Sequence, residues 1–140
     1  MHPQYFEGIL QLRNPTKEVL KFVKNQIEKR KDLFISKEIE LKNGRDLYLS
    51  SQKFLRALGL KLQKRFGGQL KTSRKLHTIS KKTGKKLYRV TVLFKIPQFK
   101  KGDIIKYRGE QIKIKAIGKK IFAQNIKTGK KLTIRFKDII

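Results

Sequence analysis

The sequence predicts an α+β domain followed by a small all-β unit. Up to about Pro97, apolar residues switch between strand-like and helix-like spacing in the order β-α-β-β-α-β-β, which indicates one sheet with both helices on a single face. After this proline, short apolar runs separated by glycine turns show no helical spacing, as expected for a small SH3-like barrel. We therefore expect two domains, residues 1–97 and residues 98–140.

The first strand and the first helix follow each other near the start of the sequence. Residues 4–13 are apolar and aromatic enough for a strand. Asn14 then offers a helix N-cap, and Pro15 suits the first helical position because its fixed φ and missing N–H are tolerated there. The helix is predicted to reach about Lys31. Its apolar stripe holds Val19, Val23 and Ile27, with Leu20 and Phe22 beside them.

A β-hairpin is predicted next. Residues 34–42 hold a strand, and Asn43-Gly44 is a strong turn signal because both residue types tolerate a positive φ. In the strand that follows, two leucines alternate with Asp46 and Tyr48.

A second helix and a second hairpin complete the first domain. Ser50 or Ser51 can cap the helix, and Gly67-Gly68 can end it, since a left-handed residue commonly closes a helix. The apolar face of the helix holds Phe54, Leu55, Leu58, Leu62 and Phe66. Residues 69–79 and 86–96 then pair around the turn at 82–85. The second of these strands alternates through Tyr88, Val90, Val92, Phe94 and Ile96.

The second domain is predicted from four short strands at residues 103–107, 111–117, 120–125 and 131–136. Turn signals separate them at Arg108-Gly109, at Gly118 and at Thr128-Gly129. The string KTGKKL occurs at 82–87 and again at 127–132, with unrelated flanking residues. We interpret the repeat as one hairpin solution used twice, not as a duplicated domain.

The charge of the chain favours a polyanionic partner. The sequence holds 37 Lys and Arg against 10 Asp and Glu, a net charge of +27. Residues 1–97 have 24 basic and 7 acidic residues (net +17), and residues 98–140 have 13 and 3 (net +10). Self-repulsion at this density disfavours the compact state, and nucleic acid would relieve it. We expect no membrane partner, because no run approaches the ~20 apolar residues of a bilayer span and the basic residues are not gathered on one amphipathic helix.

Metal, cofactor and catalytic sites are poorly supported. The absence of cysteine excludes disulfides and thiolate ligands, and the two histidines are far apart in sequence, so we expect no metal and no cofactor. No phosphate-cradling GxxxxGK[ST] motif is present, and no two carboxylates have catalytic spacing. His77, with Ser73 or Ser80 nearby, is the one candidate base, but a lone histidine in a basic strand is more often a spectator. We therefore predict no catalytic residue.

Three groups of residues are candidates for phosphate contacts. The strongest lies on the second hairpin: Lys71, Ser73, Arg74, Lys75, Lys81, Lys82, Lys85 and Lys86. Strand alternation places Arg74 on the face opposite Lys71, Ser73 and Lys75. The second group follows the polar face of the second helix: Lys53, Arg56, Lys61, Lys64 and Arg65. The third occupies two loop tips of the second domain: Lys119, Lys120, Lys127, Lys130 and Lys131. Each group also has a simpler interpretation as a solvated, solubilising surface.

Exposed aromatic side chains would indicate base stacking. Most Tyr and Phe residues follow apolar periodicities and are expected in the core, which leaves Tyr48, Tyr107 and Phe99 as candidates. The aromatic pattern of an RRM-type RNA-binding domain is absent, so base-specific recognition is weakly supported.

Several motifs stand in a characteristic order along the chain: YFEGILQLR at 5–13, NGRDLYLSS at 43–51, RFGG at 65–68 running into SRKL at 73–76, TGK at 83–85, YRVTVL at 88–93, IP at 96–97 and KGD at 101–103. Together they resemble the archaeal and eukaryotic family of large-ribosomal-subunit export adaptors named after nonsense-mediated decay, over most of the chain to about residue 108. Members of that family begin with paired CxxC zinc modules. These 140 residues hold no cysteine, so we expect the chain to lack them.

The resemblance implies a first domain similar to the L22-type eukaryotic ribosomal protein and a second part similar to translation factor five-A. It also implies binding to the intersubunit face of the large subunit, near the tRNA sites, during late maturation. We therefore interpret the chain as a cytoplasmic, non-enzymatic rRNA-binding protein, monomeric when free, with large-subunit rRNA and ribosomal proteins as partners.

Two alternatives stay open at this point. Stoichiometric presence in translating ribosomes would indicate a constitutive ribosomal protein. RNA cleavage by metal-free protein that is lost in His77→Ala would indicate a processing enzyme.

Overall fold

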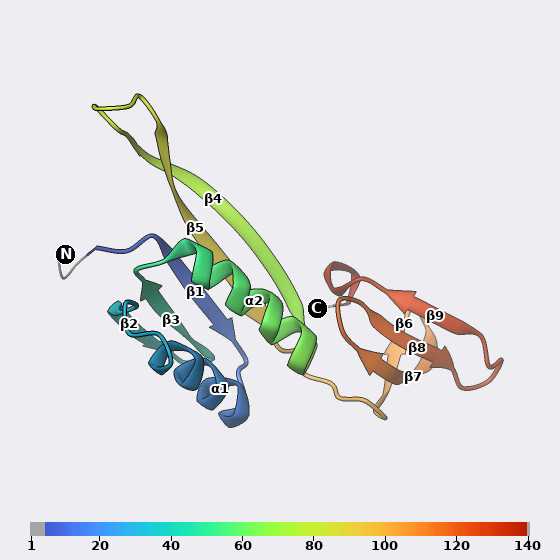
Figure 1. Ribbon diagram of the computed structural model, residues 1–140. Helices are drawn as coiled ribbons and strands as arrows, with labels where there is room; N and C mark the ends of the chain where they lie inside the picture. Colours follow the sequence, from blue (N-terminus) through green and yellow to red (C-terminus); the bar gives the residue numbers. More distant parts are fainter. Residues whose placement is uncertain (1–4, 140) are drawn as a thin grey trace.

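The structure, a computed structural model that describes residues 5–139, contains two β-sheets and two α-helices (Figure 1). The first sheet has five strands in the order β2-β3-β1-β5-β4, and the second has four in the order β6-β7-β8-β9. The first part of the chain forms β1 (Gly8–Arg13), α1 (Lys17–Glu28), β2 (Ile35–Leu41), β3 (Gly44–Leu49), α2 (Gln52–Phe66), β4 (Gln69–Ile79) and β5 (Lys86–Lys95). The second part forms β6 (Ile104–Tyr107), β7 (Glu110–Ile117), β8 (Ile121–Asn125), β9 (Lys131–Ile134) and the short 3-10 helix η1 (Phe136–Asp138).

Both helices pack on one face of the five-stranded sheet, which confirms the predicted α+β class and the predicted order of elements (Figure 1). The central strand β1 runs antiparallel to β3 and parallel to β5. Alternate residues of these strands, such as Leu10, Leu49 and Val92, are fully buried against the apolar stripes of α1 and α2. Among residues 5–139, no helix has the length and apolar character needed to cross a bilayer.

The predicted start of the first helix is wrong by two residues. Gln4, where the first strand was predicted to begin, lies outside the described residues, and β1 starts at Gly8. For the first helix α1, the N-cap is Thr16 instead of the predicted Asn14. The side-chain oxygen of Thr16 accepts a hydrogen bond from the backbone N–H of Val19 at 3.2 Å. Asn14 instead takes a left-handed conformation (φ 53°), and its N–H donates to the carbonyl of Asn43 at 2.8 Å. It therefore ends the strand and does not cap the helix.

The first hairpin forms as predicted, but its turn is shifted by one residue. The turn residues are Lys42 and Asn43, and Gly44 is already the first residue of β3, opposite Leu41 and Arg13. Gly44 is needed here for space, because a Cβ atom would overlap the backbone carbonyl of Leu12 on β1. A close approach of two strands therefore explains this glycine, and a positive φ does not.

One of the two predicted caps begins the second helix. The side-chain oxygen of Ser51 accepts from the backbone N–H of Phe54 at 3.2 Å. Ser50 is buried, and its hydroxyl oxygen accepts from the N–H of Phe34 at 3.1 Å, which ties the loop before β2 to the sheet. Gly67 ends the helix at φ 73°, as predicted.

The second sheet has its own apolar core, built around Ile112, Ile114, Ile121 and Phe136. The four predicted strands are present, except that Phe136 lies in η1 instead of the last strand. Closure into an SH3-like barrel is not confirmed, because β6 and β9 are the two edges of an open sheet in the described chain. Four short strands around six buried side chains bury their apolar face without a fifth pairing.

The two copies of KTGKKL form the same hairpin tip. Ser80 and Lys85 are joined by an N–H to carbonyl bond of 2.8 Å, and the N–H of Gly84 donates to the carbonyl of Ser80 at 2.8 Å. In the second copy, Asn125 and Lys130 are joined in the same way at 2.9 Å, and Gly129 donates to Asn125 at 2.8 Å. Gly84 and Gly129 have φ values of 69° and 74°. The structure confirms one turn geometry used twice on unrelated strands.

The two sheets meet where α2 ends. The N–H of Gly68 donates to the carbonyl of Gly118 at 3.3 Å, and a Cβ atom on Gly67 would overlap the carbonyl of Ile117. The loop between β7 and β8 therefore rests directly on the C-terminal turn of α2. This contact depends on Gly67, since a side chain there would hold the loop away.

Candidate nucleic-acid interface

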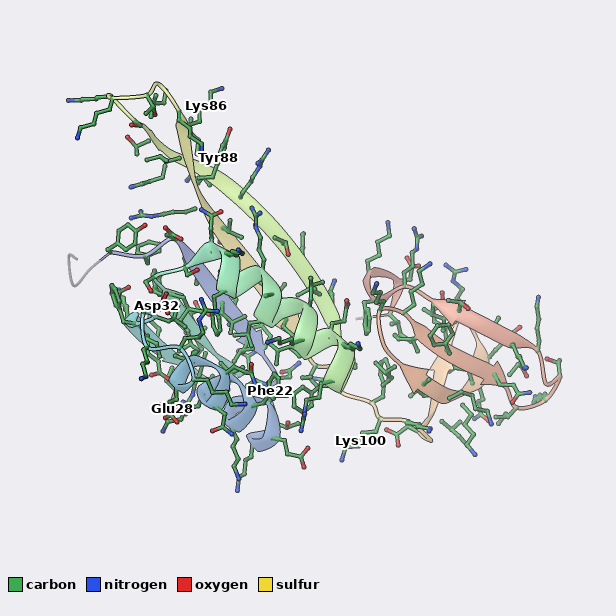
Figure 2. All side chains as sticks on the ribbon, viewed as in Figure 1. Phe22, Glu28, Asp32, Lys86, Tyr88 and Lys100 are labelled. Carbon is green, nitrogen blue, oxygen red and sulfur yellow. The ribbon has the colours of Figure 1, made fainter. Side chains whose placement is uncertain are left out.

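Positive charge is divided unequally across the first sheet. No Asp or Glu occurs between Leu47 and Gly102, a segment that carries sixteen Lys and Arg and forms α2, β4 and β5. The residues before Leu47 carry ten basic and seven acidic residues and form α1, β2 and most of β3. Because β2 and β4 are opposite edges of the sheet, one edge is close to neutral and the other is strongly cationic. Figure 2 labels Glu28 and Asp32 beside α1, far from Lys86 on the β4–β5 hairpin.

The ion pairs of the first sheet lie away from the candidate residues. Arg13 contacts Asp46 at 2.8 Å and Arg45 contacts Glu38 at 3.1 Å, both on the β1–β3–β2 side of the sheet. Within residues 5–139, none of the predicted phosphate-binding lysines and arginines forms an ion pair with a carboxylate. Their charge is therefore not compensated inside the described chain.

The β4–β5 hairpin projects past the start of α2 and is solvent-exposed over most of its length (Figure 1). Register confirms the predicted alternation. Lys71 and Lys75 lie opposite Leu93 and Arg89, on the sheet face without helices, whereas Arg74 lies opposite the buried Val90. Ser73 is on the same face as the two lysines, and Lys81, Lys82, Lys85 and Lys86 surround the tip. The hairpin thus presents cations on both faces.

The structure divides the predicted basic stripe on α2. Lys53, Lys61 and Lys64 are exposed on the helix, and the ammonium group of Lys61 donates to the side-chain oxygen of Gln26 on α1 at 3.4 Å. Arg65 turns toward α1, where its guanidinium lies 5.0 Å from the ring centre of Phe22. Arg56 turns the other way and lines a cleft beside the β4–β5 hairpin. Three of the five residues therefore form one stripe, and the other two extend the basic surface to either side.

The two loop tips of the second sheet lie at opposite ends of β8. Lys119 and Lys120 precede this strand and directly follow Gly118, whose carbonyl accepts from Gly68 just after α2. The second tip follows the strand and holds Lys127, Lys130 and Lys131. Of the two tips, only the first is joined to the end of α2 by a backbone hydrogen bond among residues 5–139.

A cleft of about 400 Å³ lies between the N-terminal turn of α2 and the β4–β5 hairpin. Its basic lining residues are Arg56, Arg74, His77, Lys85, Lys86 and Arg89. His77 enters this lining through a β-bulge, because Leu76 pairs with Tyr88 and Thr78 with Leu87, which leaves His77 as the extra residue. The guanidinium of Arg74 lies 4.6 Å from the ring centre of Tyr88 in the same cleft.

Glu7 is the one carboxylate in this cleft, and its oxygens are already engaged. One accepts the backbone N–H of Gln52 at 2.9 Å, and the other accepts the phenol O–H of Tyr5. The hydrogen bond to Glu7, followed by partial burial, raises the pKa of Tyr5 to about 12, so the phenol stays a neutral donor well above neutral pH. Glu7 therefore links the segment before β1 to the N-terminal turn of α2 by a hydrogen bond.

The three aromatic residues predicted as stacking candidates do not line this cleft. Tyr107 and Phe99 pack against the core of the second sheet, and Tyr48 lies half-buried against the ring of Phe6. Tyr88 was predicted in the core because it continues an alternating strand, yet it belongs to neither apolar core. The available signal was on the paired strand, where Leu76, the direct partner of Tyr88, is flanked by Arg74, Lys75 and His77.

Among the described residues, no group of three His, Cys, Asp or Glu side chains is placed to hold a metal ion. Within residues 5–139, no hydrogen bond joins His77 to Ser73 or Ser80.

Comparison with known proteins agrees with the resemblance in the motifs. The model of the family described as NMD3, second domain, matches residues 5–96. A search of curated proteins finds no match. NMD3 proteins are ribosome-biogenesis adaptors that associate with the large subunit, and they are not known as an enzyme family. Because the match covers well over half of the 140 residues, the chain belongs to the NMD3 family.

Proposed function

We propose that the chain binds large-subunit rRNA as a non-enzymatic late maturation factor near the tRNA sites. The observation that carries the proposal is the run from Leu47 to Gly102, which holds sixteen cations and no carboxylate. The cost of bringing these charges together on α2, β4 and β5 is relieved when they meet phosphates and release counterions. Membership of the family supports the large subunit as the place of binding.

The proposed contact surface has three parts. The first is the β4–β5 hairpin, the second is the exposed stripe Lys53, Lys61 and Lys64, and the third is the loop with Lys119 and Lys120. The Gly68–Gly118 hydrogen bond joins this loop to the residues that directly follow α2. We propose that residues 1–97 and 98–140 act as two domains, resembling an L22-type ribosomal protein and part of translation factor five-A, and that both engage rRNA in the cytoplasm.

The affinity for large-subunit rRNA is expected to fall steeply with salt. Each phosphate contact contributes a slope of roughly −0.7 to −0.9 to the dependence of log K on log salt, so three or more contacts give a slope steeper than about −2. Filter binding or fluorescence anisotropy between 50 and 200 mM salt measures this slope. A value shallower than about −2 would contradict a multi-phosphate contact surface.

Gradient fractionation of the tagged protein separates a maturation factor from a constitutive ribosomal protein. A maturation factor is expected in fractions with free large subunits. Equal amounts in translating ribosomes would favour a constitutive ribosomal protein.

A further inference from the structure

We propose that the cleft between α2 and the β4–β5 hairpin holds a single unstacked nucleotide of RNA, with the base against Tyr88 and Arg74 and the phosphate on Arg56, Lys85 and Lys86. This inference rests on the RNA-binding function proposed above and assigns it one specific subsite. It adds recognition of an unpaired base to a surface that otherwise recognises only the phosphate charge and the shape of the RNA.

The size and shape of the cleft suit one nucleotide. Its volume of about 400 Å³ falls in the range of small-ligand sites, which is roughly 300–1,000 Å³. Its walls come from the segment before β1, the first turns of α2 and both strands of the hairpin. A base inside a duplex could not enter such a recess, so the ligand must be an unpaired residue of a loop, bulge or single strand.

The charge of the cleft suits a phosphate. Arg56, Lys85 and Lys86 line it and are exposed, and none of them is paired with a carboxylate in residues 5–139. The two carboxylate oxygens of Glu7 accept hydrogen bonds from Gln52 and Tyr5. Glu7 therefore competes little with a phosphate for these three cations. Three uncommitted cations around one recess are what a phosphodiester with a neighbouring phosphate would require.

The aromatic wall suits a base and distinguishes a nucleotide from a bare phosphate. The guanidinium of Arg74 lies over the Tyr88 ring, 4.6 Å from its centre, and both side chains line the cleft. A base can therefore stack on the outer side of the guanidinium or on the ring face that Arg74 leaves open. Bases stack on tyrosine rings and on arginine planes alike. Figure 2 shows Tyr88 on the hairpin, outside the layer between the sheet and the helices, so core packing does not account for its position.

The bulge in β4 is an independent indication that the cleft is a binding site. In a regular strand, His77 would point to the sheet face opposite that of its neighbours Leu76 and Thr78. The register shift at this point changes its direction, and His77 lines the cleft. Bulges commonly re-aim one side chain at a binding site. Here the re-aimed group is a ring with two nitrogens beside the proposed base.

The test compares two RNA hexamers in 0.1 M salt, one intact and one with a single abasic residue, by fluorescence anisotropy. The wild-type protein should bind the intact strand about tenfold more tightly, since stacking of one base is worth roughly 1–3 kcal/mol. Tyr88→Ala should lose this preference and bind both strands equally, whereas Tyr88→Phe should keep it. Inorganic phosphate should compete only at concentrations that also displace the abasic strand.

Tyr107→Ala is the matched control. Tyr107 also carries an arginine over its ring, Arg108 at 5.1 Å, but it lies on the second sheet, outside the cleft. This variant should keep the preference for the intact strand. The inference is overturned if the wild type binds both strands within about twofold, or if Tyr107→Ala abolishes the preference as Tyr88→Ala does. Either result would contradict the nucleotide site alone and leave the proposed function unaffected. The proposed function fails only if the wild type binds all RNA weakly and without dependence on salt.

Discussion

Reversing the charge of Lys71, Arg74 and Lys75 together is expected to lower the affinity for large-subunit rRNA by about a thousandfold at 0.1 M salt. A phosphate contact with a slope near −1 contributes roughly tenfold at this salt concentration, and three such contacts are removed. The slope of log K on log salt should become shallower by roughly 3. The three side chains are exposed and unpaired with carboxylates in the described chain, so their reversal removes charge without opening the core.

The matched control reverses Lys17, Lys21 and Lys24, which are exposed on α1. The change in net charge is the same, but these lysines lie on the side of the sheet where the acidic residues gather. We expect a loss of about tenfold or less, caused by the weaker overall field. Circular dichroism melting should confirm that both variants fold. Equal losses in the two variants would show that the protein coats RNA diffusely, without a preferred face.

Periodicity was sufficient to predict the order of elements in the first part of the chain. The apolar stripes of α1 and α2 and the alternation of β4 and β5 depend on local spacing, which burial under a common core then enforces. The prediction was wrong at residues whose type suits two different local structures. Asn14 suits both a helix cap and a left-handed strand end, and the contact with Asn43 selects the second. Gly44 suits both a turn and a close strand approach, and Leu12 selects the second.

The candidate surface was predictable in composition but not in arrangement. Sequence identified the lysines and arginines, yet their separation from the acids follows from β2 and β4 being opposite edges of one sheet. The cleft around Tyr88 also needs the tertiary structure, because its walls come from residues as far apart as Glu7, Gln52 and Lys86. The join between α2 and the loop at Gly118 had no signal beyond two consecutive glycines.

Gly67→Val is expected to lower the affinity for large-subunit rRNA about a hundredfold, the lower end of the gain that two linked sites obtain by binding together. Gly67 has φ 73°, a conformation that costs a residue with a side chain roughly 1–2 kcal/mol. Its Cβ atom would also overlap the carbonyl of Ile117, so the loop must move and the 3.3 Å bond from Gly68 to Gly118 breaks.

The second sheet would then no longer be fixed against α2, and Lys119 and Lys120, which follow Gly118, would lose their fixed position relative to the end of this helix. Gly118→Ala is the control, because a Cβ atom there meets nothing within 4 Å and the carbonyl that accepts from Gly68 is kept. It should bind rRNA as the wild type does. Residual dipolar couplings should show a fixed orientation of the sheets in Gly118→Ala and a loose one in Gly67→Val. If Gly67→Val loosens the sheets and still binds with wild-type affinity, the two parts engage rRNA independently, and the rigid join between them has no role in recognition.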